Sequence, residues 1–171
     1  MPWSTNSLVA EVLVRLAKVG AKDCVVDPFC GAGTILRVVR RREPSSRVIG
    51  LDHDPQAIAV ARRNDVTELV RAKAEALPLP ENSVDRIITN LPFGKQVGSH
   101  HGNRTLYPAV LHEIDRVLTS AGRAVLLTED KRLLTKAIEQ QKALKVVRQR
   151  MLRYNGASPT AYVLTRPRRT R

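Results

Sequence analysis

The stretch DCVVDPFCGAGT, residues 23–34, decides the fold of this chain. It begins as a short apolar run, which is typical of a buried strand, and ends as a turn that opens the amphipathic stretch 35–42. Gly31 and Gly33 let the backbone turn tightly and approach a ligand with no Cβ in the way. A helix that follows such a turn points its N–H groups and positive end at the ligand. The stretch therefore predicts a strand–turn–helix unit with a binding site at the turn.

Apolar runs and helical patterns alternate along most of the chain. Asp54 followed by Pro55 is typical of an N-cap and the first residue of a helix. The alternation predicts a doubly wound α/β fold, in which helices cover both faces of a mostly parallel sheet. We expect strands at 23–27, 47–51, 84–89 and 123–128, and helices at 6–19, 35–42, 55–65, 106–118 and 131–140.

The last third of the chain departs from this alternation. Two extended runs, 144–152 and 161–165, are separated by the turn-rich residues 154–159, YNGASP. Consecutive strands with no helix between them form an antiparallel hairpin, which we expect at the end of the sheet. The sequence thus predicts one domain over residues 1–166 and a basic, flexible tail over 167–171.

Composition limits the class of protein. The 171 residues suit one domain, the 43% hydrophobic content is enough for a core, and no apolar run reaches the roughly 18 residues of a membrane span. Two cysteines are too few for a disulfide scaffold or a zinc ribbon. A net charge of +13 favours a polyanionic partner, while 4% aromatic residues argue against a wide base-stacking surface. We expect a soluble protein of a reducing compartment that binds nucleic acid.

Two acidic residues at strand ends indicate the kind of ligand. Asp27 would repel a pyrophosphate, and the third glycine of a dinucleotide fingerprint is missing, so a ligand with a cation is favoured, such as an α-ammonium group beside a sulfonium. Asp52, in GLDHD (50–54), stands where a carboxylate accepts both hydroxyls of a ribose. His53 is either an exposed residue at a strand end or a ring that flanks an adenine.

A third motif, NLPFG at residues 90–94, follows the next predicted strand. Together with DPFCGAGT (27–34) and GLDHD (50–54), it resembles the class I S-adenosylmethionine-dependent methyltransferases, in the branch that methylates exocyclic amines of nucleobases. Residues 89–118 resemble in particular the THUMP-associated tRNA guanine-N2 methyltransferases, and the resemblance extends over residues 4–164. It implies a seven-stranded Rossmann-like sheet, S-adenosylmethionine as cofactor with S-adenosylhomocysteine as product, RNA (above all tRNA) as substrate, and a cytoplasmic location.

The resemblance places the reaction at NLPFG. An exocyclic amine is a poor nucleophile because its lone pair is delocalised into the ring. If Asn90 Oδ1 and the Leu91 carbonyl each accept one N–H, the nitrogen is held out of conjugation and aimed at the methyl group. Pro92 stiffens the turn, and Phe93 can stack on the base, which is worth about 1–3 kcal/mol. We expect these four residues to form the catalytic loop.

The same motifs define an expected cofactor site. Many relatives bind the adenine amine with an acidic residue before the AEALP stretch, but this chain has Lys73 there. Glu75, or the backbone near Ala74, would then have to hold that amine. The expected cofactor-binding residues are Thr5, Asp27, Phe29, Cys30, Gly31, Gly33, Thr34, Asp52, His53, Ala74, Glu75 and Asn90.

The beginning of the chain bears on both ligands. Ser4 and Thr5 align with a hydroxyl-bearing segment that reaches the methionine carboxylate in relatives, and they could equally cap the helix at 6–19. Relatives with a THUMP RNA-binding domain carry it upstream, whereas this chain begins at the helix before the first strand. Either a missing domain or a separate partner supplies RNA binding, or the chain's own charge does.

Residues 95–104, KQVGSHHGNR, are basic and lack periodicity. We expect a mobile loop that contacts phosphates, with Lys95 and Arg104 as the first candidates. His100 and His101 are not expected to bind a metal, because adjacent histidines point apart and no acidic or cysteine partner is nearby. No metal and no membrane partner is expected.

Rival functions remain open beside guanine-N2 methylation of tRNA. Asn-x-Pro-aromatic loops also serve N6-adenine methylation of RNA or DNA. Lys73 keeps open a non-catalytic, methyltransferase-like subunit that binds RNA. A small-molecule methyltransferase is disfavoured by the charge and by Phe93.

Overall fold

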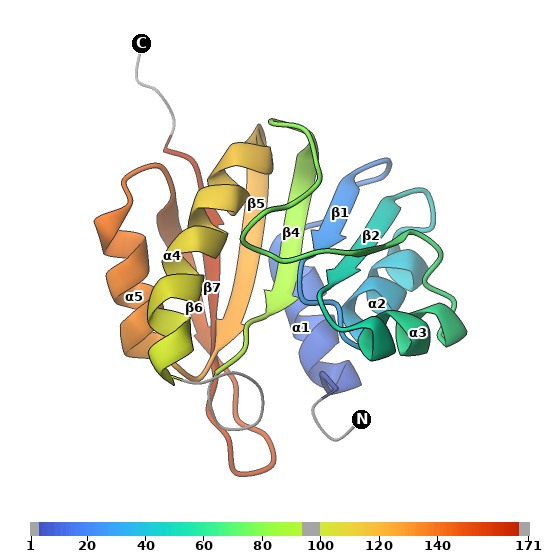
Figure 1. Ribbon diagram of the computed structural model, residues 1–171, viewed down its shortest axis with the longest axis horizontal. Helices are drawn as coiled ribbons and strands as arrows, with labels where there is room; N and C mark the ends of the chain where they lie inside the picture. The colour runs from blue at the N-terminus through green and yellow to red at the C-terminus, as the bar shows by residue number, and fades with distance from the viewer. Residues whose placement is uncertain (1–3, 94–99, 168–171) are drawn as a thin grey trace.

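The computed structural model describes residues 4–93 and 100–167. Its strands form one seven-stranded sheet in the order β3-β2-β1-β4-β5-β7-β6 (Figure 1). β1 to β5 run parallel, and β7 is antiparallel to both β5 and β6. The doubly wound, mostly parallel α/β fold is thereby confirmed. The strands are β1 (Cys24–Asp27), β2 (Arg47–Asp52), β3 (Leu69–Arg71), β4 (Val84–Asn90), β5 (Leu118–Thr128), β6 (Lys145–Met151) and β7 (Thr160–Thr165).

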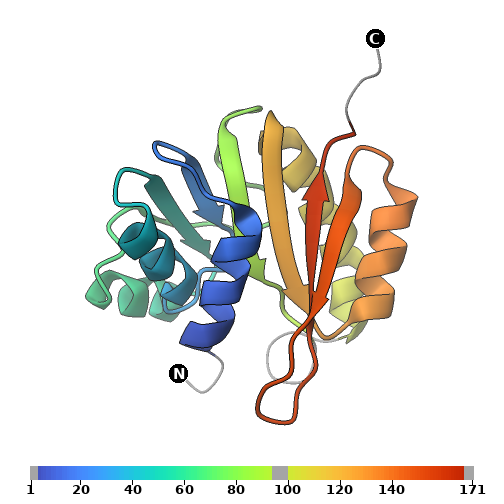
Figure 2. The ribbon, with the colours of Figure 1, turned by 180° about the vertical axis from the view of Figure 1, so that it is seen from behind.

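Helices cover both faces of the sheet. α4 and α5 lie on the face seen in Figure 1, and α1 lies on the opposite face, seen in Figure 2. Because side chains alternate along a strand, Val25 joins the core on the α1 side and Val26 joins the core on the α4 side. The helices are α1 (Ser7–Ala17), α2 (Thr34–Arg42), α3 (Pro55–Arg63), α4 (His100–Val117) and α5 (Lys131–Gln140).

α4 differs most from its prediction. It begins at His100 instead of residue 106, and Leu118 already belongs to β5, so the expected helix was wrong at both ends. The sequence gives no periodic signal for the start of the helix, because residues 100–105 are polar and the apolar periodicity begins only with Leu106. α4 has 18 residues, and neither it nor any other described helix is long and apolar enough to cross a membrane.

β3 is a strand that the sequence did not locate. It has only three residues, lies at the edge of the sheet, and leaves Val70 and Arg71 exposed, so no apolar run marks it. The C-terminal hairpin is confirmed, but its order in the sheet could not be predicted. β7 is inserted beside β5, and β6 becomes the outer strand.

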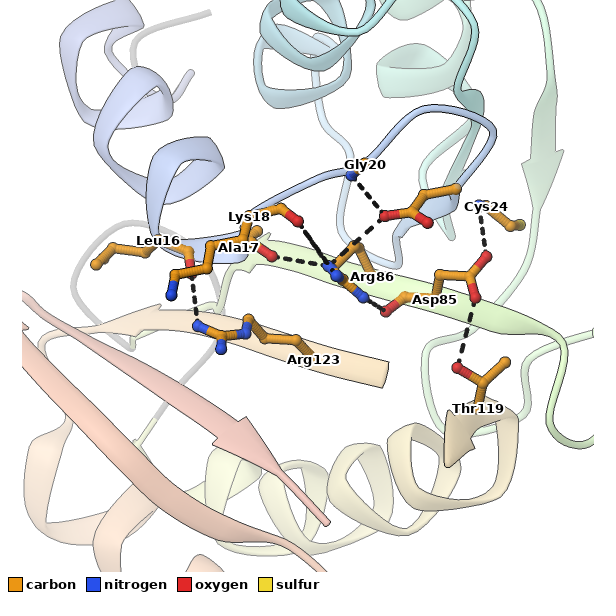
Figure 3. Close-up of polar contacts among 10 residues, drawn as sticks. Leu16, Ala17, Lys18, Gly20, Cys24, Asp85, Arg86, Thr119 and Arg123 are labelled. Carbon is orange, nitrogen blue, oxygen red and sulfur yellow. Dashed lines mark hydrogen bonds and ion pairs between the residues drawn. The ribbon is translucent and has the colours of Figure 1, made fainter. Parts of the chain in front are cut away.

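Guanidinium groups fix the C-terminal end of α1 against β4 and β5 (Figure 3). Arg86 Nε donates to the Ala17 carbonyl at 2.8 Å, and Arg86 Nη2 donates to the Lys18 carbonyl at 3.2 Å. Arg123 Nη1 donates to the Leu16 carbonyl at 3.2 Å. These carbonyls have no partner within the helix and carry its negative dipole end, so cations suit them. The contacts set the position of α1, and Ser4 and Thr5, just before its first residue, line the candidate site.

Candidate active site

A cavity of about 370 Å³ opens at the carboxyl ends of β1, β2 and β4. Most of the predicted site residues line it, as do several residues outside the set of expected cofactor-binding and catalytic residues. The predicted residues in its wall are Thr5, Phe29, Cys30, Gly31, Thr34, Asp52, His53, Ala74, Glu75, Asn90, Leu91, Pro92 and Phe93. The additional ones are Ser4, Pro28, Ala32, Ala72, Lys73 and Leu106.

The glycine turn after β1 forms one wall and leads into α2. Gly33, the residue before the helix, has φ of +81°, a left-handed conformation that glycine adopts without strain. A Cβ at Gly33 would also stand only 2.5 Å from Val66 Cγ2. Gly33 therefore shapes the turn from behind and does not itself line the cavity.

The Asp52 carboxylate holds the glycine turn and the end of β2 together. Its Oδ2 accepts the Gly31 N–H at 3.0 Å, and its Oδ1 accepts the Asp54 N–H at 3.0 Å. Each oxygen keeps a further lone pair. The His53 ring is 69% exposed, with Nδ1 3.6 Å from Asp52 Oδ1. Asp54 accepts from Gln56 N–H, which confirms it as the N-cap of α3.

Asp27 lies beneath the turn and does not line the cavity. It is 1% exposed, and its Oδ1 accepts from Thr89 Oγ1 at 2.6 Å and from the Phe29 N–H at 3.0 Å. Burial raises the pKa of Asp27 from 3.8 to about 7, even though both hydrogen bonds favour the ionised form. At neutral pH this carboxyl group is thus close to half-protonated.

Asn90 ends β4 at the cavity wall with an unusual buried acceptor. Its Nδ2 donates to Thr5 Oγ1 at 3.4 Å, a long contact. Its Oδ1 is buried and has no hydrogen-bond partner among the described residues. Such groups are rare in folded proteins and often mark a site where a ligand supplies the missing donor.

A buried hydrogen-bond network holds the loop that follows Asn90. The Pro92 carbonyl accepts from Tyr107 Oη at 2.5 Å and from Asn103 Nδ2 at 2.9 Å. Tyr107 is 1% exposed, and its hydroxyl also contacts Thr128 Oγ1 at 2.8 Å. Neither Tyr107 nor Asn103 was among the residues expected at the site. Their spacing of one helical turn on α4 was the only signal available.

The wall formed by residues 72–75 is braced from α4. Glu113 Oε2 accepts the Leu77 N–H at 2.6 Å, and Arg116 donates to the Leu77 carbonyl at 2.8 Å. The adjacent Arg116 guanidinium holds the pKa of the Glu113 carboxyl below its ordinary value. Within the wall Ala74 is buried, whereas Lys73 is exposed at the cavity.

The N-terminal segment reaches the cavity beside the glycine turn. Ser4 Oγ lies 3.2 Å from Thr34 Oγ1, and Thr5 contacts Asn90 as described above. The N-cap of α1 is Asn6, whose side chain accepts from the Leu8 N–H, so the reading of Ser4 or Thr5 as the cap was wrong. Asn6 accepts this bond directly, which leaves the two hydroxyls at the cavity.

The segment expected to contact RNA is only partly a loop. Residues 100–104 belong to the N-terminal part of α4, so half of the expected loop 95–104 is helical. Arg104 is exposed on α4 and does not line the cavity. Lys95 lies outside the described residues, as do residues 168–171 of the predicted tail.

The fold and the cavity define the class of protein, a class I S-adenosylmethionine-dependent methyltransferase. The glycine turn, the Asp52 carboxylate and the loop after Asn90 meet at one cavity although they are far apart in the sequence. The chain belongs to the family of RMKL-like methyltransferase domains, whose family model matches residues 1–37 and 36–159.

Named relatives support this assignment and extend beyond the chain. The human tRNA (guanine(6)-N(2))-methyltransferase THUMP3 is 34% identical over 185 aligned residues, which cover 96% of this chain and 36% of the human protein. The tRNA (guanine(6)-N2)-methyltransferase of Thermus thermophilus is 33% identical, over 94% of this chain and 50% of its own length. The crystal structure of TrmN from Thermus thermophilus has a TM-score of 0.86 at 30% identity, covering 96% of this chain and 50% of TrmN. The chain thus spans half or less of these relatives.

Proposed function

We propose that this chain transfers a methyl group from S-adenosylmethionine to N2 of guanine in RNA, with tRNA as the substrate. The observation that carries the proposal is the buried Asn90 Oδ1, which has no partner among the described residues. An unsatisfied buried acceptor costs about 1–3 kcal/mol, and a substrate N–H would remove that cost. The names of the human and Thermus thermophilus relatives support guanine N2 of tRNA as the source of that N–H.

The donor set around the cavity fits the cofactor. S-adenosylmethionine supplies an electrophilic methyl group. Asp52 would bind the two ribose hydroxyls with the lone pairs that Gly31 and Asp54 leave free. Ala74 and Glu75 lie in the wall where the adenine amine is expected, and the cavity has the size of ordinary small-molecule sites. Asp27, beneath the turn, would respond to a nearby cation through its charge.

The loop after β4 would align the amine. The Pro92 carbonyl is already held by Asn103 and Tyr107, so Asn90 Oδ1 and the Leu91 carbonyl are the acceptors left for the two N–H groups of the base. Both oxygens favour the positive charge that develops on the nitrogen. Phe93 lines the cavity and would stack on the base, which must be unpaired or flipped to enter.

The basic surface would hold the substrate backbone. We infer one catalytic domain over residues 1–166, with Lys95, Arg104 and the tail 167–171 among its RNA contacts. These relatives are two to three times as long as the chain. Poor methylation of RNA by the chain alone would indicate that the working enzyme includes a further RNA-binding domain or a separate partner. A tRNA substrate favours a cytoplasmic location.

Methylation of bulk tRNA with labelled S-adenosylmethionine, followed by digestion to nucleosides, tests the proposal. We expect labelled N2-methylguanosine. Asn90→Ala should lose at least tenfold in kcat while calorimetry shows cofactor binding unchanged, because Asn90 would act on the base; a factor of ten corresponds to about 1.4 kcal/mol. Asn82→Ala is the matched control, because Asn82 is exposed before β4 and does not line the cavity.

The other outcomes separate the rivals. Labelled N6-methyladenosine in the digest would show that the target base is adenine and not guanine. Intact RNA affinity without any cofactor binding would favour a non-catalytic subunit. Equal turnover of Asn90→Ala and the unmodified chain would refute the role of the unpaired oxygen.

A further inference from the structure

The C-terminal hairpin projects at the same end of the molecule as the cavity. In Figures 1 and 2 it extends past the carboxyl ends of the parallel strands. We propose that this hairpin is an RNA-contacting arm, in which Arg150 and Arg153 bind phosphates beside the target nucleotide. The inference rests on the proposed function, because it takes RNA as the substrate. By the hairpin arm we mean residues 148–159.

The register of the sheet places the arm near Asn90. Asn90 pairs with Leu127 of β5, Leu127 pairs with Ala161 of β7, and Ala161 pairs with Arg150 of β6. Three strand spacings of about 4.8 Å separate the backbone of Asn90 from that of Arg150 by roughly 14 Å. Paired residues of neighbouring strands point to the same face, so Arg150 shares the α1 side of the sheet with Leu127. An RNA strand whose base enters at Asn90 could therefore pass over the arm.

The charge of the arm matches a polyanion. Residues 140–171 contain no Asp or Glu. Arg148, Arg150 and Arg153 are exposed, and their side chains have neither a hydrogen bond nor an ion pair with any described residue. By contrast, Arg41 and Arg42 of α2 are paired with Glu11. The arm thus offers cations that the fold does not use, and phosphate groups would satisfy them.

The arm has a defined shape. Tyr154 and Ala157 exchange backbone hydrogen bonds of 3.2 and 2.9 Å around Asn155 and Gly156, whose φ values are +48° and +74°. Two positive φ values with Asn-Gly indicate a type I′ turn, which continues the twist of the strands. Leu152 and Tyr154 pack against the core on the α1 side. A preformed arm loses little conformational entropy when it binds.

Equilibrium binding of bulk tRNA, measured by fluorescence anisotropy at several salt concentrations, tests the arm without requiring methyl transfer. Binding weakens as salt rises, so the slope of log affinity against log salt is negative. R150A/R153A should reduce the magnitude of this slope by about 2, one for each phosphate contact. R62A/R63A is the matched control, because it removes the same charge from exposed residues of α3, on the opposite flank of the sheet beside β2 and β3. R150K/R153K retains the charge and should keep the slope. With methylation as a second readout, R150A/R153A should raise KM for tRNA and leave kcat unchanged.

The outcomes distinguish this inference from the proposed function. Equal slopes for R150A/R153A and R62A/R63A would overturn the arm, whether or not the chain methylates tRNA. A chain that methylates no RNA would overturn the proposed function, while the difference in slope would still report on the arm. Binding of polyglutamate that depends on Arg150 and Arg153, with tRNA binding that does not, would assign the arm to an acidic protein and refute the inference. Cofactor binding equal to that of the unmodified chain checks that each variant is folded.

Discussion

Asp27→Asn should change how the stability of the cofactor-free protein depends on pH. The pKa of Asp27 is about 7 in the folded protein, against an ordinary value of 3.8, because the carboxyl group is buried. Between these two values the folded protein binds a proton at Asp27 that the unfolded chain does not. The free energy of unfolding therefore falls as the pH rises through this window, and it stays lowered above it. Below about pH 4 the carboxyl group is protonated in both states and makes no difference.

The size of the effect follows from the shift. About three pK units at about 1.4 kcal/mol each give a cost of about 4 kcal/mol once Asp27 is ionised. Asparagine can still accept from Thr89 Oγ1 and the Phe29 N–H through Oδ1, but it carries no charge. The free energy of unfolding of Asp27→Asn minus that of the unmodified protein should therefore rise by about 4 kcal/mol from pH 4 to pH 8.

Urea unfolding followed by circular dichroism at several pH values measures this difference. The slope against pH decides the outcome, because a new amide group in a buried position adds an offset that is the same at every pH. Asp54→Asn is the matched control, since it makes the same chemical change at a helix N-cap, where asparagine also serves. A difference that is constant between pH 4 and pH 8 would refute the assignment of a buried, proton-binding carboxyl group to Asp27.

Two further substitutions test how the cavity is built. Gly33→Ala should destabilise the fold by about 2 kcal/mol or more, because residue 33 has φ of +81° and its Cβ would stand 2.5 Å from Val66 Cγ2. Unfolding in urea measures this change in stability. An unchanged free energy of unfolding would contradict the tight turn. Tyr107→Phe should cost about 1 kcal/mol of stability and lower kcat without changing cofactor affinity, because the Pro92 carbonyl loses one of its two donors while Asn103 still holds it. Equal kcat with calorimetric binding unchanged would show that Asn103 alone positions the loop.

Local patterns in the sequence determined most of the fold. The run from Cys24 to Asp27 with its glycine turn, the Asp54-Pro55 start of α3 and the Asn155-Gly156 turn each depend on residues within a few positions of one another. For that reason their prediction needed no knowledge of the rest of the chain. The motifs at strand ends were expected to share one site because of their resemblance to the methyltransferases. The fold explains this, since parallel strands bring their carboxyl ends to the same edge of the sheet.

Tertiary structure decided what depends on distant partners. β3 has too few residues for a pattern and exists because it pairs with β2, and β7 takes its place beside β5 through pairings that the order of the chain does not specify. Asp27 becomes buried and binds its proton only when β1 and β4 are assembled. The hydrogen bond from Tyr107 to the Pro92 carbonyl likewise forms only when α4 packs beside the end of β4. The motifs thus selected most of the residues that line the cavity, while packing between remote segments decided which of their atoms are already hydrogen-bonded and which, like Asn90 Oδ1, have no partner among the described residues.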